Sequence, residues 1–385
     1  MENFIYDIPT KVYFGKDQIH ALSNELPSYG SKVLLVYGGG SIRKNGIYNR
    51  VCEQISKAGL TQIELSGVEP NPRIETVREG VMLCIDHEID VILPVGGGSV
   101  IDCAKAIAAS YASGIDAWRL IEDNSRIVKV LPIIAILTIA TTGSEMDGIA
   151  VISDTSKHEK RPLKHPLLRP RLAILDPVYT CSVSAPQTAA GIADILSHLM
   201  ETYFSNVEGY MQERMCEALM KTCIHCGLLA YKDGNDYEAR ANLMWTATWA
   251  INDFLKAGRP VTWSVHAIEH QLSACYDITH GVGLAILTPH WMKHILNEKT
   301  VHKFAQFARE VWDVDEMDDK AAAYKGIDSL QNFFQFLHLP KSLREVGIQE
   351  KTRFEEMAEK ALPYLVDIYY PLTKEDIVHI YEQSY

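Results

Sequence analysis

The sequence predicts an α/β N-terminal domain with a parallel sheet, followed by an all-α helical-bundle C-terminal domain. Up to about residue 176, short β-branched runs alternate with helical segments, which is typical of parallel strands joined by helices. These strands are apolar throughout, which indicates burial on both faces of the sheet. After Pro177 the chain shows long helical patterns and no convincing strand. We therefore expect an α/β domain over residues 1–178 and a helical domain over residues 179–385.

The individual elements follow from the same patterns. In the N-terminal half, strands are expected at residues 32–37, 62–65, 90–95 and 133–137, and helices at 46–58, 74–87 and 99–111. In the C-terminal half, helices are expected at residues 186–204, 208–231, 237–255, 261–274, 301–311, 320–337 and 351–362. The N-terminus of the helix expected at residues 186–204 is clearly signalled, because Ser184 and Gln187 have the spacing of a capping box and Pro186 lies in the first turn.

The composition argues against several classes of partner. The chain has 385 residues, of which 47% are hydrophobic and 22% charged, so it can bury a core and lacks the signature of disorder. Its net charge is −12 without a Lys/Arg-rich block, which argues against binding to nucleic acid or to anionic membranes. The N-terminus has no basic segment of the kind that begins a signal peptide. We expect a cytoplasmic protein whose eight cysteines are free thiols.

Two glycine-rich turns follow predicted strands and open the next helices. One contains Gly38, Gly39, Gly40 and Ser41, and the other contains Gly96, Gly97, Gly98 and Ser99. Backbone N–H groups in such a turn, with the positive end of a helix behind them, can bind phosphate. Ser99 is expected to cap its helix, in a capping box with Asp102. Neither turn has the full G-x-G-x-x-G pattern, and one such loop alone is as often a plain tight turn.

A third loop, residues 138–145, also follows a predicted strand and supplies hydroxyl groups, among them those of Thr138 and Thr142. Open α/β sheets bind ligands at the carboxyl ends of their strands. The three loops together therefore favour a dinucleotide as the ligand of the first domain.

Potential metal ligands recur at helical spacing in the second half. Asp194 and His198 are four residues apart on one predicted helix, and so are His266 and His270 on another, with His280 ten residues further on. An isolated pair of this kind is more often a surface feature. The histidines near residue 270, however, lie in an apolar segment where unpaired imidazoles are costly. One carboxylate with three imidazoles suits Fe²⁺ or Zn²⁺ better than Mg²⁺ or Ca²⁺.

Three segments carry a resemblance to a known family. Residues 90–105 (DVILPVGGGSVIDCAK), 191–198 (GIADILSH) and 266–281 (HAIEHQLSACYDITHG) resemble those of the iron-containing (group III) alcohol dehydrogenases. The similarity covers nearly the whole chain in the right order. Within that family it is greatest to the NADPH-dependent butanol dehydrogenase and broad-range aldehyde reductase branch.

The resemblance implies a fold, a cofactor and a set of site residues. It implies a dehydroquinate synthase-like fold with an N-terminal dinucleotide-binding domain and, from the family, a homodimer. The implied ligands of one divalent metal ion are Asp194, His198, His266 and His280, with His270 beside them as a supporting or proton-relay group. The implied contacts to the cofactor pyrophosphate are Gly97, Gly98, Ser99 and Asp102, with Thr138 and Thr142 near the nicotinamide and Lys160 elsewhere on the cofactor.

The first glycine loop departs from the pattern of many family members, which carry an Asp that binds the adenosine ribose. This chain has Gly38 and Gly39 there instead. A carboxylate would repel a 2′-phosphate, so its absence, with Ser41, Arg43 and Lys44 nearby, favours NADP(H).

The expected activity is hydride transfer between NADP(H) and a primary alcohol or aldehyde, with short aliphatic aldehydes such as butanal as substrates. Either His270 or a water chain would supply the proton. Two alternatives remain open at this point. A metal-dependent lyase or cyclase of the dehydroquinate-synthase type would need basic residues around the metal, and the sequence offers few. A non-catalytic nucleotide-binding protein would use the histidine cluster only structurally.

Overall fold

The computed structural model describes residues 1–261 and 263–385, and the chain divides into two compact units. The α/β unit comprises Asp7–Val183 and Gly234–Asn252, and the helical unit comprises Met1–Tyr6, Ser184–Asp233 and Asp253–Tyr385. Helix α9 (Tyr237–Ile251) therefore belongs to the α/β unit, whereas a boundary at residue 178 would place it with the other helices. One reason lies in its last turn, where Thr248 donates a hydrogen bond of 2.5 Å to the buried carboxylate of Glu145.

The α/β unit contains a six-stranded sheet in which every neighbouring pair of strands is parallel. Its strands are β1 (Lys11–Phe14), β2 (Lys32–Tyr37), β3 (Thr61–Leu65), β4 (Val91–Gly96), β5 (Ile134–Leu137) and β8 (Leu172–Leu175). Their order across the sheet is β1-β8-β5-β4-β2-β3. Four of them match the predicted strands, and the short β1 and β8 were not predicted.

A separate antiparallel hairpin, β6 (Ile149–Asp154) with β7 (Glu159–Lys164), was also not predicted. Strand β7 includes four charged residues and a proline, so it lacks the apolar run that marks the strands of the main sheet.

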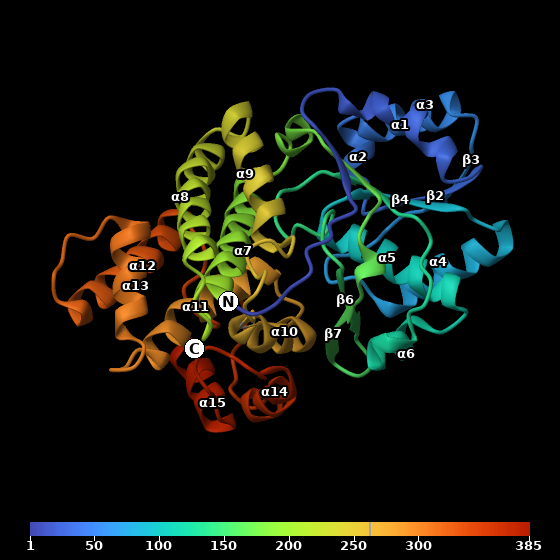
Figure 1. The fold of residues 1–385 in the computed structure, drawn as a ribbon. Helices are drawn as coiled ribbons and strands as arrows, with labels where there is room; N and C mark the ends of the chain where they lie inside the picture. Colours follow the sequence, from blue (N-terminus) through green and yellow to red (C-terminus); the bar gives the residue numbers. More distant parts are fainter. Residues whose placement is uncertain (262) are drawn as a thin grey trace. The chain divides into compact units, whose positions relative to one another are not determined.

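Helices cover both faces of the main sheet (Figure 1). On one side lie α1 (Leu22–Glu25), α2 (Ser41–Lys44) and α3 (Ile47–Lys57), and on the other α4 (Ile74–His87), α5 (Gly98–Ser113) and α6 (Ala117–Glu122). Successive residues of β2 alternate between these layers, since Leu35 joins the core that contains Val51 of α3 and Leu34 joins the core that contains Val77 of α4. The prediction that the strands are buried on both faces is confirmed.

The helical unit contains the remaining long helices. They are α7 (Ala185–Tyr203), α8 (Tyr210–Lys232), α10 (Ser264–Tyr276), α11 (His280–Ile295), α12 (Val301–Trp312), α13 (Asp319–Phe336), α14 (Phe354–Ala361) and α15 (Lys374–Gln383). As predicted, Ser184 caps α7 and accepts a hydrogen bond of 3.4 Å from the backbone N–H of Gln187. None of the helices in the described ranges is long and apolar enough to cross a membrane.

Helix α11 was not predicted, because Gly281 and Gly283 suggest a break in the sequence. The structure places both glycines inside the first turn of α11, where neighbouring elements come very close. A Cβ atom on Gly281 would lie 2.0 Å from the backbone oxygen of Ala190 in α7, and one on Gly283 would lie 2.8 Å from the side chain of Glu269 in α10. The glycines thus let His280, the first residue of α11, approach the other two helices.

Candidate functional site

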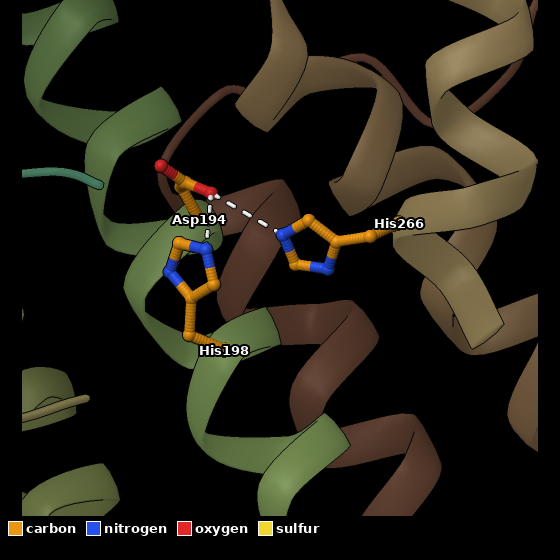
Figure 2. Close-up of side chains that lie close together, drawn as sticks. All are labelled: Asp194, His198 and His266. Carbon is orange, nitrogen blue, oxygen red and sulfur yellow. Dashed lines mark ion pairs between the residues drawn. The ribbon is translucent and has the colours of Figure 1, made fainter. Parts of the chain in front are cut away.

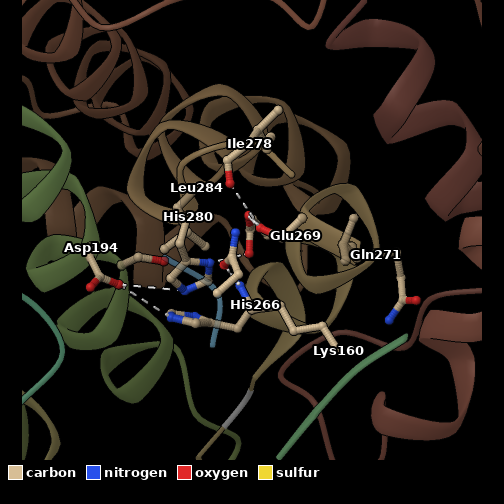
Figure 3. Close-up of polar contacts among 12 residues, drawn as sticks. Lys160, Asp194, His266, Glu269, Gln271, Ile278, His280 and Leu284 are labelled. Carbon is tan, nitrogen blue, oxygen red and sulfur yellow. Dashed lines mark hydrogen bonds and ion pairs between the residues drawn. The ribbon is translucent and has the colours of Figure 1, made fainter. Parts of the chain in front are cut away.

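Four side chains from three helices of the helical unit converge on one point. Asp194 and His198 lie one turn apart on α7, His266 lies near the start of α10, and His280 begins α11. The Nε2 atoms of His198, His266 and His280 lie 3.7, 3.8 and 3.8 Å from the same atom, Asp194 Oδ1 (Figures 2 and 3). The structure therefore brings together the four residues that the resemblance implies as metal ligands.

The chemistry of this cluster fits a divalent metal ion. Asp194 Oδ1 and His266 Nε2 are buried and have no hydrogen-bond partner among the described residues, a costly arrangement unless a ligand binds them. Four ligands about 2.1 Å from a tetrahedral ion lie about 3.4 Å apart, close to the 3.7–3.8 Å that separates each imidazole Nε2 from Asp194 Oδ1. An oxygen and three imidazole nitrogens suit iron or zinc.

Glu201 supports His266 from behind. It lies seven residues after Asp194 on the same face of α7, and its Oε1 lies 2.6 Å from Nδ1 of His266. The same carboxylate accepts hydrogen bonds from the backbone N–H groups of Val265 and His266, at 3.1 and 3.0 Å, in the first turn of α10. Glu201 thus orients the imidazole, and it accepts hydrogen bonds from N–H groups that have no partner within the first turn of that helix.

Glu269 supports His280 in the same way. Its fully buried carboxylate contacts Nδ1 of His280 and accepts a hydrogen bond of 2.5 Å from Ser273 (Figure 3). An Nδ1–H held by a carboxylate leaves Nε2 with the lone pair that a metal requires. Neither glutamate was predicted as a site residue. Glu201 could have been found from its spacing to Asp194 and His198, and Glu269 as an acid inside an apolar helix.

His198 differs from the other two imidazoles. Its Nδ1 is buried and has no hydrogen-bond partner among the described residues. Its ring instead stacks on that of His266, with centroids 4.7 Å apart, and the edge of Trp263 lies against both rings. Ring packing, rather than a hydrogen bond from Nδ1 to a carboxylate, therefore holds the His198 side chain in position.

The protonation preferences in the cluster follow from burial and charge. Burial alone would raise the pKa of Asp194, but the three imidazoles, His198 foremost, hold it well below its ordinary value. Burial lowers the pKa of His198 to about 3, so this ring is neutral. Burial also opposes the charge on His266, yet Glu201 and Asp194 raise its pKa to about 9. A metal must therefore displace one proton from His266.

His270 lies at the margin of the cluster. Its ring centroid is 5.5 Å from that of His280 and 6.2 Å from that of His266, and the side chain is half-buried. Nitrogens of His270 and His280 lie within 4.8 Å of each other and of an oxygen of Glu269. His270 is thus beside the expected ligands, and its catalytic role stays a prediction.

In the α/β unit, the three predicted loops lie side by side. They follow β2, β4 and β5, which are neighbours in the sheet, so their carboxyl ends share one edge. The chain runs outward from β2 to β3 and then continues on the opposite side of β2, so a topological switch point lies between β2 and β4. Ligands of open α/β sheets bind at such points.

The second and third loops are closely packed. A Cβ atom on Gly98 would lie 2.4 Å from the hydroxyl oxygen of Thr142, and one on Gly97 would lie 2.2 Å from Ile139. The predicted capping of this helix is wrong, because α5 begins at Gly98 with Gly97 as its N-cap residue and no side-chain cap. The close approach of the third loop requires glycine here, and the helix starts one residue before the predicted range of 99–111.

Asp102 does not bond Ser99 as predicted. Its buried carboxylate accepts hydrogen bonds of 2.6 Å from Ser144 and 2.8 Å from the backbone of Val151, and burial raises the pKa of Asp102 to about 6. Its expected contact with the cofactor stays a prediction. Next to it, the fully buried Lys105 donates hydrogen bonds to Ser144 of the third loop at 2.9 Å and to Asp147 at 2.6 Å, a link between α5 and this loop that was not predicted.

The remaining predicted cofactor residues lie near the first loop or the hairpin. The carbonyl of Gly38 accepts a hydrogen bond of 3.2 Å from the N–H of Gly67, Gly39 has open space where a side chain would be, and Ser41 begins α2. Lys160, on β7, is buried and donates to Asn71 at 2.9 Å. Their contacts with a cofactor stay predictions.

Comparison with known proteins decides the family. The family model described as "Iron-containing alcohol dehydrogenase" matches residues 9–177, and the model of the C-terminal part of the same family matches residues 188–385. The chain belongs to the iron-containing alcohol dehydrogenase family. The predicted resemblance is confirmed.

Individual relatives align with nine-tenths or more of the chain. The NADH-dependent butanol dehydrogenase A of Clostridium acetobutylicum is 49% identical and aligns with 100% of both chains, and the NADPH-dependent aldehyde reductase YqhD of Escherichia coli is 36% identical over 90% of each. The solved structure of NADH-dependent butanol dehydrogenase A from Thermotoga maritima matches with a TM-score of 0.95 at 36% identity and covers 100% of this chain and 99% of that one. The predicted fold class is confirmed, and the chain is an oxidoreductase.

Proposed function

We propose that this protein interconverts short aliphatic aldehydes, such as butanal, and their primary alcohols with NADP(H) and one divalent metal ion, Fe²⁺ or Zn²⁺. The observation that carries the proposal is the convergence of three imidazole nitrogens on Asp194 Oδ1. Relatives named butanol dehydrogenase and aldehyde reductase support the substrate class. We further propose that the protein acts as a cytoplasmic homodimer.

The residues of the chain have distinct roles in this reaction. Once bound, the metal supplies a Lewis acid for the substrate oxygen and the nicotinamide supplies the hydride. Asp194, His198, His266 and His280 would hold the metal, and Glu201 and Glu269 keep two of the imidazoles oriented. Gly97, Gly98 and Ser99, at the start of α5, would bind the pyrophosphate through backbone N–H groups.

His270 is the proposed proton donor to the product oxygen. The ring lies beside His280 yet is half-buried rather than enclosed, so it can exchange protons with solvent. His270→Ala should lower kcat by about 10–100-fold while metal stays bound, as expected for a group outside the ligand set. His270→Gln, which keeps the size and hydrogen-bonding capacity but cannot transfer a proton, should be equally slow. Loss of metal from both variants would instead make His270 a ligand.

The preference for NADP(H) rests on the first glycine loop. No carboxylate stands at Gly38 or Gly39, and Arg43 lies in α2 just beyond them. The relatives include proteins named for NADH and proteins named for NADPH, so the family alone leaves this choice open. A kcat/KM for NADH equal to or above that for NADPH would overturn the preference. Gly39→Asp should shift it toward NAD(H).

The test of the overall proposal is oxidation of NADPH with butanal, before and after treatment with a chelator. We expect turnover that chelation abolishes and that added Fe²⁺ or Zn²⁺ restores. Absence of turnover with a fully metal-loaded protein would overturn the proposed substrate. Turnover that survives complete metal removal would overturn the role of the metal.

A further inference from the structure

A cluster of polar side chains lies directly beside the first glycine loop and is not used in the mechanism above. Tyr37 is the last residue of β2 and immediately precedes Gly38, Arg43 lies in the short helix α2 after the loop, and Glu64 lies near the end of the neighbouring strand β3. The segment after β3 is fixed to the same loop, since the N–H of Val68 donates to the carbonyl of Tyr37 at 3.2 Å. These side chains therefore lie at the end of the site where the proposed function puts the adenosine ribose.

Glu64 is the centre of this cluster. Its carboxylate accepts hydrogen bonds from Tyr48 at 2.6 Å, Tyr37 at 2.7 Å, Gln62 at 2.8 Å and Arg43 at 2.9 Å. Partial burial opposes its charge, but the hydrogen bonds from Tyr48 and Tyr37 outweigh burial and hold the pKa of Glu64 below its ordinary value. Glu64 is thus an ionised acceptor in a fixed position.

Arg43 is held on three sides, one of them by the Tyr37 hydroxyl oxygen, which accepts hydrogen bonds from Nε at 3.2 Å and from Nη2 at 2.5 Å. Its guanidinium group lies 3.7 Å from the centroid of the Tyr48 ring and forms the ion pair with Glu64. A guanidinium binds phosphate as readily as carboxylate, in the same planar geometry. About half of the Arg43 side chain is exposed, so an anion from solvent can reach it.

We propose that Glu64 is a specificity-determining residue that competes with the 2′-phosphate of NADP(H) for Arg43 and thereby limits the preference for NADP(H) over NAD(H). The inference rests on the proposed function, because it requires the adenosine end of the cofactor at the first glycine loop. NAD(H) has a ribose hydroxyl in place of the 2′-phosphate and does not need Arg43 to leave Glu64. The ion pair therefore weakens the binding of only one of the two cofactors.

The test measures dissociation constants for NADPH and NADH by fluorescence titration, without any turnover. Glu64→Gln keeps the shape of the side chain but removes its charge and replaces one of its two acceptor oxygens by an NH2 donor. It should raise the ratio of the NADH to the NADPH dissociation constant by about tenfold, the size of one charge-assisted hydrogen bond. Arg43→Met should lower that ratio by a similar factor and leave NADH binding nearly unchanged.

The double variant Glu64→Gln with Arg43→Met separates competition for Arg43 from simple repulsion by Glu64. If Glu64 acts through Arg43, the double variant should behave like Arg43→Met, with no gain from the loss of Glu64. A gain that persists without Arg43 would overturn the inference, and so would an unchanged ratio in Glu64→Gln. Lys57→Met is the matched control, because it removes an exposed cation at the end of α3 that pairs with Glu53 rather than with Glu64, and it should change the ratio far less than Arg43→Met.

Two further measurements keep the result interpretable. Adenosine 2′,5′-bisphosphate and 5′-AMP differ only in the 2′-phosphate, and their affinities for each variant should follow those of NADPH and NADH. Gly39→Asp tests the underlying site. If Gly39→Asp shifts the preference toward NAD(H) and Glu64→Gln has no effect, only the role of Glu64 fails. If neither Gly39→Asp nor Arg43→Met alters binding of either cofactor, the proposed position of the cofactor itself fails.

Discussion

The two units prepare their sites in different ways. In the helical unit, the cluster around Asp194 is made of side chains, and its geometry depends on three helices and two buried glutamates. In the α/β unit, the proposed phosphate site is made of backbone, and its geometry depends on glycines such as Gly98 that leave no room for a side chain. The first site concentrates negative charge for a cation, and the second presents N–H groups to an anion.

Because the two sites are built differently, we expect a substitution that abolishes binding at one site to leave binding at the other intact. Removing a ligand from the helical unit removes an electron donor without altering the glycine loops. Adding an atom to a glycine loop displaces backbone without altering the ligand set.

The largest effect is expected when a metal ligand is lost. His280→Ala, and equally His266→Ala, should abolish metal retention and turnover while NADPH binding stays near that of the unchanged protein. Elemental analysis and NADPH titration measure the two properties. His302→Ala is the control, since this exposed histidine of α12 should be dispensable for both. A His280→Ala protein with stoichiometric metal and normal activity would exclude His280 as a ligand.

A smaller effect is expected when the ligands stay and their support is lost. Glu269→Gln and Glu201→Gln should each weaken metal affinity by about 10–100-fold, because the imidazole is less well oriented and less basic. Competition with a chelator of known affinity measures this. Ser273→Ala, which removes only the hydroxyl that bonds Glu269, should lose less affinity than Glu269→Gln. Unchanged affinity in both glutamine variants would contradict the supporting role.

Metal affinity should also depend on pH in a defined direction. The pKa of His266 is raised to about 9, so below that pH a proton competes with the metal and affinity should rise with pH by up to tenfold per unit. The rise should level off near pH 9. In Glu201→Gln the levelling should occur at lower pH, because Glu201 is a main cause of the raised pKa. Affinity that falls between about pH 6 and pH 9 would contradict this assignment.

The smallest effect is expected in the α/β unit. Gly98→Ala introduces a Cβ atom 2.4 Å from Thr142 Oγ1, so it should destabilise the fold by about 1–3 kcal/mol and weaken NADPH binding, with metal content unchanged. Thermal unfolding measures the loss of stability. The double variant Gly98→Ala with Thr142→Ala should recover most of it, because the second change removes the clashing atoms. No recovery would mean that the clash lies elsewhere.

Most of the helices and strands could be predicted from local sequence patterns. Four of the six strands of the main sheet, the start of α7 at Ser184, and the helical nature of the second half are visible in apolar spacing and capping residues. Elements without such a pattern were missed. Helix α11 was missed because Gly281 and Gly283 disfavour a helix locally, and only contacts with α7 and α10 explain them.

By itself, the sequence identified candidate metal ligands by residue type and spacing, with His270 among them, and the family resemblance singled out Asp194, His198, His266 and His280. Only the tertiary structure decided how they are arranged and supported. Three helices must meet before three nitrogens share one carboxylate oxygen and before Glu201 and Glu269 reach their imidazoles. The same holds for Arg43 and Glu64, which are 21 residues apart and meet only because β2 and β3 are adjacent in the sheet. The spacing of residues along the chain determines which side chains are neighbours on one helix or strand. Which side chains of different helices and strands become neighbours is determined by tertiary packing.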